Sequence, residues 1–185
     1  SQEEQEEMVH LLKRVSKSLD ETMRNLNEVV NIRTNFNLTI ERLNLNDFIE
    51  RSISVLEKQI KDKQVNIQNL VPKHIEIDYN VAYLESILYN FISNAIRYSN
   101  PDKQPLIVLR FDEEKKALSI SDNGIGIDLK RNGENLFGMY KTFNNNPDAK
   151  GIGLFISKNQ IDAMGGRIET KSEIDQGTTF TIYFK

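Results

Sequence analysis

Asn90 and Asn94 lie one helical turn apart in a segment whose side chains could bind a metal ion and a phosphate group. In a helix, Arg97 and Tyr98 would extend the same stripe. An amide oxygen suits Mg²⁺, which keeps water and phosphate oxygens as its other ligands. An arginine can donate charge-assisted hydrogen bonds to phosphate. The alternative for this segment alone is a surface helix with two asparagines, although asparagine is a poor helix former.

A second candidate site is Asp122-Asn123-Gly124-Ile125-Gly126, which directly follows a predicted strand. A carboxylate only accepts hydrogen bonds, so Asp122 could take one from the exocyclic amine of adenine, where guanine has a carbonyl oxygen. Two glycines one residue apart let the backbone approach a flat ligand closely. A plain glycine-rich turn is the competing interpretation. A dinucleotide-binding fingerprint fits poorly, because the third glycine and the following helix are absent.

Two further segments could contact a nucleotide. Lys150-Gly151-Ile152-Gly153-Leu154 opens a predicted helix, and exposed N–H groups at the positive end of a helix form a natural phosphate site. This segment is not a P-loop, because no Gly-Lys-Ser/Thr follows, and a flexible helix start is the alternative. After Gly177, the hydroxyl of Thr178 could bridge through water to a base, or Thr178 could be an ordinary β-branched strand residue.

The elements that must position these residues fall into two regions. Residues 1–42 contain no Gly or Pro, and their apolar residues recur at alternating spacings of four and three, which predicts one long helix that packs against a partner helix. The residues of this stripe are Met8, Leu12, Val15, Leu19, Leu26 and Val29. We place the domain boundary after residue 42, so that residues 43–185 form the second domain.

The second region mixes helix and strand patterns. We expect a helix that Asn46 caps, a long helix over 81–98, and a helix over 152–164 that ends at Gly165-Gly166. Short alternating runs predict strands at 65–67 and 75–77, and longer ones predict hairpins over 106–121 and 167–184. This order predicts an α+β fold, a two-layer sandwich with one mixed, mostly antiparallel sheet and helices on one face.

Composition excludes several classes of protein. Twenty-four basic and 27 acidic residues give a net charge of −3, so no overall field would attract nucleic acid. The absence of cysteine excludes disulfides and thiolate metal sites. No apolar run approaches the roughly 20 residues that span a bilayer, and the acidic start is not a signal peptide. We expect a cytoplasmic fragment without direct membrane contact, and leave open whether the parent protein is membrane-anchored.

Taken together, the order and spacing of these segments resemble the histidine-kinase-type, or Bergerat, ATPase superfamily. A further segment between them, Leu136 to Phe143, is similar to the F box of sensor histidine kinases. The resemblance covers about residues 43–185 as the catalytic and ATP-binding domain. The preceding helix resembles the second helix of the dimerisation and histidine-phosphotransfer hairpin. The matching segments are Asn90–Tyr98 for the N box, Asp122–Gly126 and Lys150–Leu154 for the first two glycine boxes, and Gly177-Thr178 for the third.

The resemblance implies a site for ATP and Mg²⁺ and a role for each matching residue. Asn94 would ligate Mg²⁺ with Asn90 beside it, and Asp122 would select adenine. Residues from about 128 to 150 would form a mobile lid. Thr142 stands where many relatives carry an arginine that faces the phosphates, so Lys141 or Lys150 could make that contact instead. The other residues implied are Gly124, Gly126, Gly151 and Gly153 for the shape of the pocket, Phe137 and Tyr140 as lid anchors, and Arg97, Tyr98, Leu154 and Thr178 as further nucleotide contacts.

No phosphate-accepting histidine matches the family motif, in which the histidine precedes an acidic residue and then typically Leu-Arg and Pro. His10 is followed by Leu11-Leu12-Lys13-Arg14, and His74 lies in a predicted surface loop. We therefore expect that the chain begins after the acceptor helix, and that it binds ATP–Mg²⁺ without phosphorylating itself. No catalytic residue is assigned.

The resemblance implies the kinase core of a two-component sensor histidine kinase. The whole protein would move the γ-phosphate of ATP to a histidine and then to an aspartate of a response-regulator receiver domain, and would form a homodimer through the helical hairpin. Two alternatives stay open: another ATPase of the superfamily, including an anti-sigma kinase, and a degenerate nucleotide-sensing or dimerisation module.

Overall fold

The computed structural model describes residues 5, 7–13, 15–16, 23, 38–139 and 151–185, and it divides the chain into two compact units, 1–36 and 37–185. In the first unit, the described residues are helical. Three residues of the predicted apolar stripe, Met8, Leu12 and Val15, are exposed there. The stripe residues Leu19, Leu26 and Val29 lie outside the described residues.

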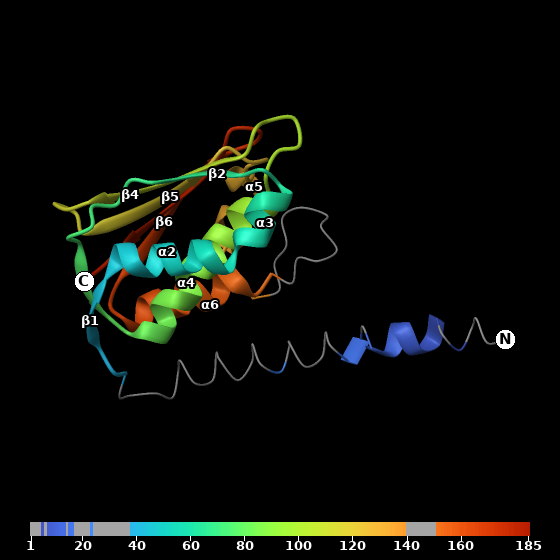
Figure 1. The fold of residues 1–185 in the computed structure, drawn as a ribbon, viewed down its shortest axis with the longest axis horizontal. Helices are drawn as coiled ribbons and strands as arrows, with labels where there is room; N and C mark the ends of the chain where they lie inside the picture. Colours follow the sequence, from blue (N-terminus) through green and yellow to red (C-terminus); the bar gives the residue numbers. More distant parts are fainter. Residues whose placement is uncertain (1–4, 6, 14, 17–22, 24–37, 140–150) are drawn as a thin grey trace. The chain divides into compact units, whose positions relative to one another are not determined.

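The main sheet of the second unit is mixed and mostly antiparallel, as expected (Figure 1). Among the described residues its strand order is β2-β4-β5-β7-β6, and the β2–β4 pair is parallel while the other three pairs are antiparallel. The two predicted hairpins are confirmed as β4–β5 and β6–β7. The strands are β2 (Asn66–Asn69), β4 (Leu106–Asp112), β5 (Ala117–Asp122), β6 (Arg167–Glu173) and β7 (Gly177–Tyr183).

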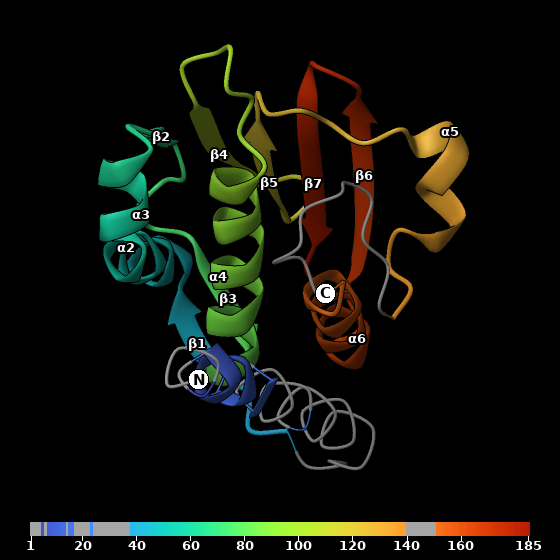
Figure 2. The same cartoon turned by 90° about the vertical axis from the view of Figure 1, so that its right-hand side faces the viewer.

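Helices cover one face of this sheet, so the predicted two-layer arrangement is confirmed (Figure 2). They are α2 (Leu45–Val55), α3 (Glu57–Asp62), α4 (Val81–Arg97) and α6 (Gly153–Ala163). The central helix α4 buries its apolar stripe against the sheet, and its Phe91 ring lies 4.7 Å from the Phe180 ring of β7. Full burial of such a side chain stabilises a fold by roughly 1.5–3 kcal/mol, so this stripe fixes the helix that carries Asn90 and Asn94.

The expectation of one sheet is wrong in one respect, because β3 (Glu76–Tyr79) pairs with β1 (Glu41–Asn44) in a separate two-stranded antiparallel sheet. The helix expected over residues 1–42 is therefore also wrong at its end, since Glu41 and Arg42 lie in β1. Pairing with β3 buries Leu43 opposite Ile77. This tertiary gain outweighs the weak local preference of these residues for a helix.

The predicted cap of α2 is wrong by two residues. Asn44 caps the helix, because its Oδ1 accepts a hydrogen bond from the backbone N–H of Asp47 over 3.1 Å. Asn46 lies inside the helix instead, is buried, and donates its Nδ2 to the carbonyl oxygen of Val71 at 2.8 Å. Both asparagines satisfy the local rule for a cap, and the contact with Val71 decides between them.

The segment after β5 contains two short helical turns, α5 (Leu129–Asn132) and η1 (Gly133–Asn135). The expected helix over 152–164 is confirmed as α6, which ends at Ala163, and the chain then turns at Gly165, whose φ of 73° favours glycine. Among the described residues, no helix combines the length and the apolarity that a membrane span requires.

Candidate functional site

Asp122 is the last residue of β5, and its carboxylate faces two backbone N–H donors. Its Oδ1 accepts hydrogen bonds from the backbone N–H of Gly124 at 2.8 Å and of Thr178 at 3.2 Å. Burial raises the pKa of the Asp122 carboxyl above its usual range, and the two N–H donors offset part of that effect. Both bonds use Oδ1, so Oδ2 can accept a donor from a ligand.

At two positions, Gly124 and Gly126, the loop after Asp122 runs too close to its neighbours for a residue larger than glycine. A Cβ at Gly124 would overlap the carbonyl oxygen of Tyr98, and a Cβ at Gly126, whose φ is 68°, would overlap the carbonyl oxygen of Glu173. Between the two glycines, Ile125 donates its N–H to the Tyr98 carbonyl at 3.0 Å, and its own carbonyl accepts from Asp175 at 2.9 Å. The first predicted glycine segment is thus joined to the end of α4 and to the β6–β7 turn.

The polar stripe of α4 faces the start of α6. Asn94 donates its Nδ2 to Asn90 Oδ1 at 3.1 Å, and Asn90 donates its Nδ2 to the hydroxyl of Ser157 at 2.7 Å. A Cβ at Gly153 would overlap the Asn90 amide oxygen. The first predicted segment and the third therefore meet at Asn90, although 63 residues separate Asn90 from Gly153 in sequence.

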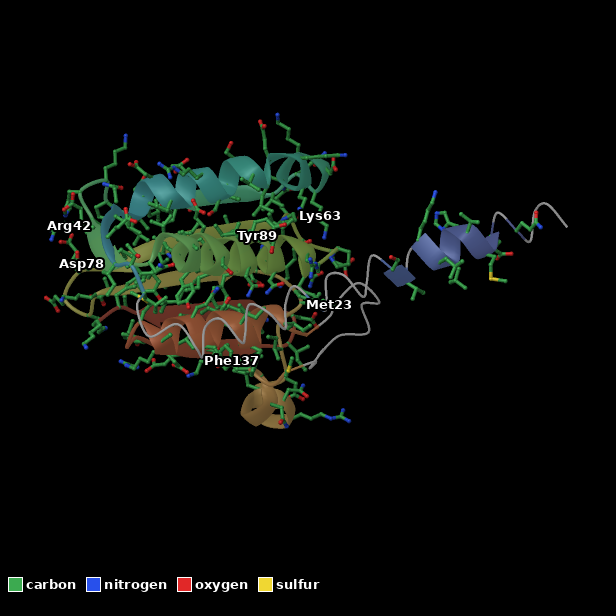
Figure 3. All side chains as sticks on the ribbon, turned by 90° about the horizontal axis from the view of Figure 1, so that it is seen from below. Met23, Arg42, Lys63, Asp78, Tyr89 and Phe137 are labelled. Atoms are coloured by element: carbon green, nitrogen blue, oxygen red, sulfur yellow. The ribbon has the colours of Figure 1, made fainter. Side chains whose placement is uncertain are left out.

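The C-terminal end of α4 is held by a cation, Lys63, which directly follows α3. Lys63 Nζ donates to the carbonyl oxygens of Ile96 at 2.9 Å and of Arg97 at 3.0 Å. Figure 3 shows Lys63 at the end of the sandwich opposite to Arg42 and Asp78. A positive charge at this position also interacts favourably with the helix dipole. Lys63 thereby fixes the turn of α4 that brings Tyr98 to the glycine loop.

Thr178 is buried, and its hydroxyl belongs to a small network around Ser172. Ser172 Oγ accepts from the backbone N–H of Ile127 at 2.8 Å, donates to the Gly177 carbonyl at 2.8 Å, and lies 2.9 Å from Thr178 Oγ1. Because Ser172 uses its one proton on Gly177, the Thr178 hydroxyl must donate to Ser172. The predicted bridge to a base through water would therefore use the acceptor positions of Thr178.

The predicted site residues divide into three groups. The structure brings together Asn90, Asn94 and Gly153, and it joins Tyr98, Gly124, Gly126, Asp122 and Thr178 through the contacts above. Arg97 is exposed in the last turn of α4, while Phe137, Gly151 and Leu154 are partly exposed. Residues 140–150 of the predicted lid lie outside the described residues, and with them the named residues Tyr140, Lys141, Thr142 and Lys150.

Two polar side chains of this network, Ser157 and Ser172, were not predicted from the sequence, and Asn123 was named only as a member of the Asp122–Gly126 segment. Asn123 holds the start of β4, since it accepts from Leu106 N–H and donates to the Gln104 carbonyl, each at 2.9 Å. The two serines could have been identified only by their position in the sequence pattern, because each is a polar residue on the inward face of its element. That pattern names no partner, and the partners lie far away in sequence.

The donor set fits a magnesium ion that is held partly by phosphate. In the described portion of the chain, no cluster of three or more His, Cys, Asp and Glu could hold a metal ion. The bond to Asn90 uses the amide nitrogen of Asn94, so its oxygen can serve as a single protein ligand. Mg²⁺ typically accepts one or two protein ligands and completes its shell with water and substrate phosphates.

The comparisons with known proteins agree with this geometry. The family model described as "Histidine kinase-, DNA gyrase B-, and HSP90-like ATPase" matches residues 80–185. The chain is 30% identical over 178 residues to the signal transduction histidine-protein kinase ArlS of Staphylococcus haemolyticus, covering 94% of this chain and 38% of that relative. The chain therefore spans well under half of the length of this relative.

Solved structures share the fold at low sequence identity. The Acinetobacter baumannii histidine kinase AdeS superposes with a TM-score of 0.74 at 20% identity, over 92% of this chain and 79% of that chain. Full-length ShkA in complex with AMPPNP superposes with a TM-score of 0.70 at 21% identity, over 91% of this chain and 36% of that chain. These likenesses support the two-layer fold described above.

Proposed function

Because this chain belongs to the histidine kinase-, DNA gyrase B- and HSP90-like ATPase family, we propose that its second unit binds ATP as the kinase core of a two-component sensor histidine kinase. One relationship carries the proposal: the partly desolvated carboxylate of Asp122 and the amides of Asn90 and Asn94 belong to elements that the Ile125–Tyr98 hydrogen bond joins directly. In this proposal, Asp122 would recognise the base and the amides of Asn90 and Asn94 would face the phosphates of the same ligand.

The adenine end of the ligand would be recognised by Asp122. Since two backbone N–H groups occupy Oδ1, the exocyclic amine of adenine would donate to Oδ2. Guanine has a carbonyl oxygen at that position, and two acceptors would face each other. Because Gly124 and Gly126 lack a Cβ, the loop can lie directly against the carbonyl oxygens of Tyr98 and Glu173, which holds Asp122 in place for the base.

The phosphates would lie between α4 and the start of α6. Asn94 would offer its amide oxygen to Mg²⁺, and the N–H groups at the start of α6 would face phosphate oxygens, as helix N-termini commonly do. Arg97, Lys141 and Lys150 are the proposed cationic contacts to the phosphates. When bound, Mg²⁺ would supply neutralisation of the phosphate charge.

Phosphoryl transfer requires little covalent chemistry from the protein, since catalysis comes mainly from positioning and electrostatic stabilisation. The residues above would hold the γ-phosphate in line with a histidine on an acceptor helix outside residues 43–185. A receiver-domain aspartate would then take the phosphate, and the intact protein would dimerise through its helical hairpin and act in the cytoplasm. The names of ArlS and AdeS, both histidine kinases, and the AMPPNP complex of ShkA support this assignment.

Calorimetric titration of the chain with ATP and with GTP in the presence of Mg²⁺ tests the nucleotide site. We expect ATP to bind and GTP to bind at least about tenfold more weakly, because one lost charge-assisted bond costs roughly 1.5–3 kcal/mol. Equal affinities would contradict base recognition by Asp122, and undetectable ATP binding would favour a degenerate module.

Labelling with [γ-³²P]ATP tests the reaction. We expect no stable label on the chain alone, including at His10, and acid-labile label on an acceptor hairpin that is added or fused. Release of free phosphate without label on the hairpin would favour a simple ATPase of the same family. A variant with His10→Gln serves as the control, and it should behave like the unchanged chain.

A further inference from the structure

Ser157 is a buried hydroxyl on the buried face of α6, which also carries Gln160. Its neighbours on this face, Ile156 and Ile161, are buried as well, and Ser157 itself is fully shielded from solvent. An apolar residue of similar size would bury at lower cost, since a hydroxyl that leaves water requires a compensating hydrogen bond. The position therefore suggests that the hydroxyl has a specific partner.

That partner is Asn90, at 2.7 Å from Asn90 Nδ2 to Ser157 Oγ. A serine in a helix can donate its own proton to a carbonyl one turn earlier, which leaves its oxygen to accept from Asn90. A side-chain amide has its acceptor on one side and its donors on the other. Once the Asn90 nitrogen is directed to Ser157, the Asn90 oxygen must lie on the other side of the amide, where it faces Asn94 and the backbone of Gly153.

The Asn90 oxygen accordingly accepts from Asn94 Nδ2 at 3.1 Å. This bond uses the nitrogen of the second amide, so the oxygen of Asn94 is directed to the opposite side. Turning Asn94 over would bring two oxygens together at Asn90 and would present an N–H₂ group to any cation. Two consecutive hydrogen bonds thus connect Ser157 to the orientation of an amide that it does not touch.

We propose that Ser157 is a positioning residue that sets the amide orientation of Asn94 through Asn90 and thereby controls the affinity of the site for Mg²⁺. The inference rests on the proposed function, because it concerns the metal that would accompany ATP. It is specific to this arrangement: Ser157 contacts neither the nucleotide nor the metal, and it acts through the partner of the ligand residue. Outer partners of metal ligands commonly alter metal affinity by 10- to 100-fold.

The test measures the affinity for AMPPNP once with Mg²⁺ and once with EDTA. The quantity compared between variants is the affinity with Mg²⁺ divided by the affinity with EDTA. For Ser157→Ala we expect this ratio to fall by about tenfold, while the affinity in EDTA stays within about twofold of the unchanged chain. Ser157→Thr keeps the hydroxyl and should therefore have the same ratio as the unchanged chain. Manganese binding to the nucleotide complex, followed by electron paramagnetic resonance, should weaken in parallel for Ser157→Ala.

Ser52→Ala is the matched control, because Ser52 is also buried but donates to the Phe48 carbonyl within α2. It should leave the ratio unchanged. Ser157→Cys keeps nearly the same volume and offers only a weak acceptor, so it should lower the ratio without opening a cavity, and it serves as the test if Ser157→Ala does not fold.

An unchanged ratio in folded Ser157→Ala and Ser157→Cys would overturn the inference and leave the proposed function intact. Equal losses with Mg²⁺ and with EDTA would also overturn it, because they would indicate a structural role. If the unchanged chain bound no AMPPNP, the proposed function itself would fail, and the titration of that chain alone reveals this.

Discussion

The backbone N–H of Thr178 donates to Asp122 Oδ1 over 3.2 Å, although 56 residues separate the two in sequence. Together with the N–H of Gly124, it commits one carboxylate oxygen to the protein and leaves the other for a ligand. The strand β7 therefore determines the orientation of the Asp122 carboxylate at the end of β5.

Asp122→Asn should weaken ATP binding strongly while the fold persists. The two backbone N–H groups would keep the amide oxygen of the new side chain at the Oδ1 position. Its N–H₂ group would then face the exocyclic amine of adenine, donor against donor. We expect a loss of about 1.5–3 kcal/mol in calorimetry, or roughly 10- to 100-fold. Asp112→Asn, in an exposed hairpin position, is the control and should bind like the original chain.

Asp122→Asn should also remove one pH dependence of the free energy of unfolding. Burial raises the folded-state pKa of Asp122 above that of the unfolded chain, so between those two values the folded state binds more protons. The free energy of unfolding then falls as pH rises through this interval. Asp122→Asn removes the titrating group, so its stability relative to the original chain should rise over this pH range. Urea denaturation at a series of pH values from 3 to 7 would measure it, and parallel curves would contradict the prediction.

Gly153→Ala should impair binding of Mg²⁺–nucleotide more than it impairs stability. The new Cβ would overlap the amide oxygen of Asn90, and the Asn90 side chain can move aside only by leaving Ser157 and Asn94. We expect the Mg²⁺-dependent part of AMPPNP affinity to drop by about tenfold. Gly133→Ala is the matched control, since its Cβ would meet only Leu129 Cβ at 3.9 Å. That variant should bind normally; equal losses in both would show that the Asn90 contact is irrelevant.

Lys63→Met should destabilise the second unit, because two carbonyls at the end of α4 lose a charged donor. The expected loss in the free energy of unfolding is about 1 kcal/mol, measured by urea denaturation. Lys61→Met is the control: Lys61 forms an exposed pair with Glu57 four residues away, and such pairs contribute roughly 0.3–0.5 kcal/mol. A loss no greater than that of the control would rule out a role for Lys63 at the helix end.

Periodic patterns predicted the elements that bury a continuous face. The spacing of Leu84, Leu88 and Phe91 marks one side of α4, and these residues are buried as expected. The hairpins followed from alternation on both sides of short polar turns. The candidate residues Asp122 and Asn94 were found because unusual residue types stood at fixed distances from glycines and from each other.

Features that depend on residues far away in sequence could not be predicted from the sequence. β3 alternates like any half-buried strand, and nothing within its four residues indicates that it pairs with β1 and not with the main sheet. Asn46 was predicted to cap α2, but its side chain donates to the carbonyl of Val71, which lies 25 residues away in sequence. Ser157 and Ser172 look like ordinary helix and strand residues, since their partners Asn90 and Ile127 lie 67 and 45 residues away.

The position of β7 has a consequence for how the protein is made. β7 follows the other strands in sequence, yet it lies between β5 and β6, and β6 joins the sheet only through it among the described strands. A polypeptide synthesised only as far as β6 would have neither the second donor to Asp122 nor a place for its newest strand. Nascent chains on the ribosome would thus complete the surroundings of Asp122 only after β7 has been synthesised.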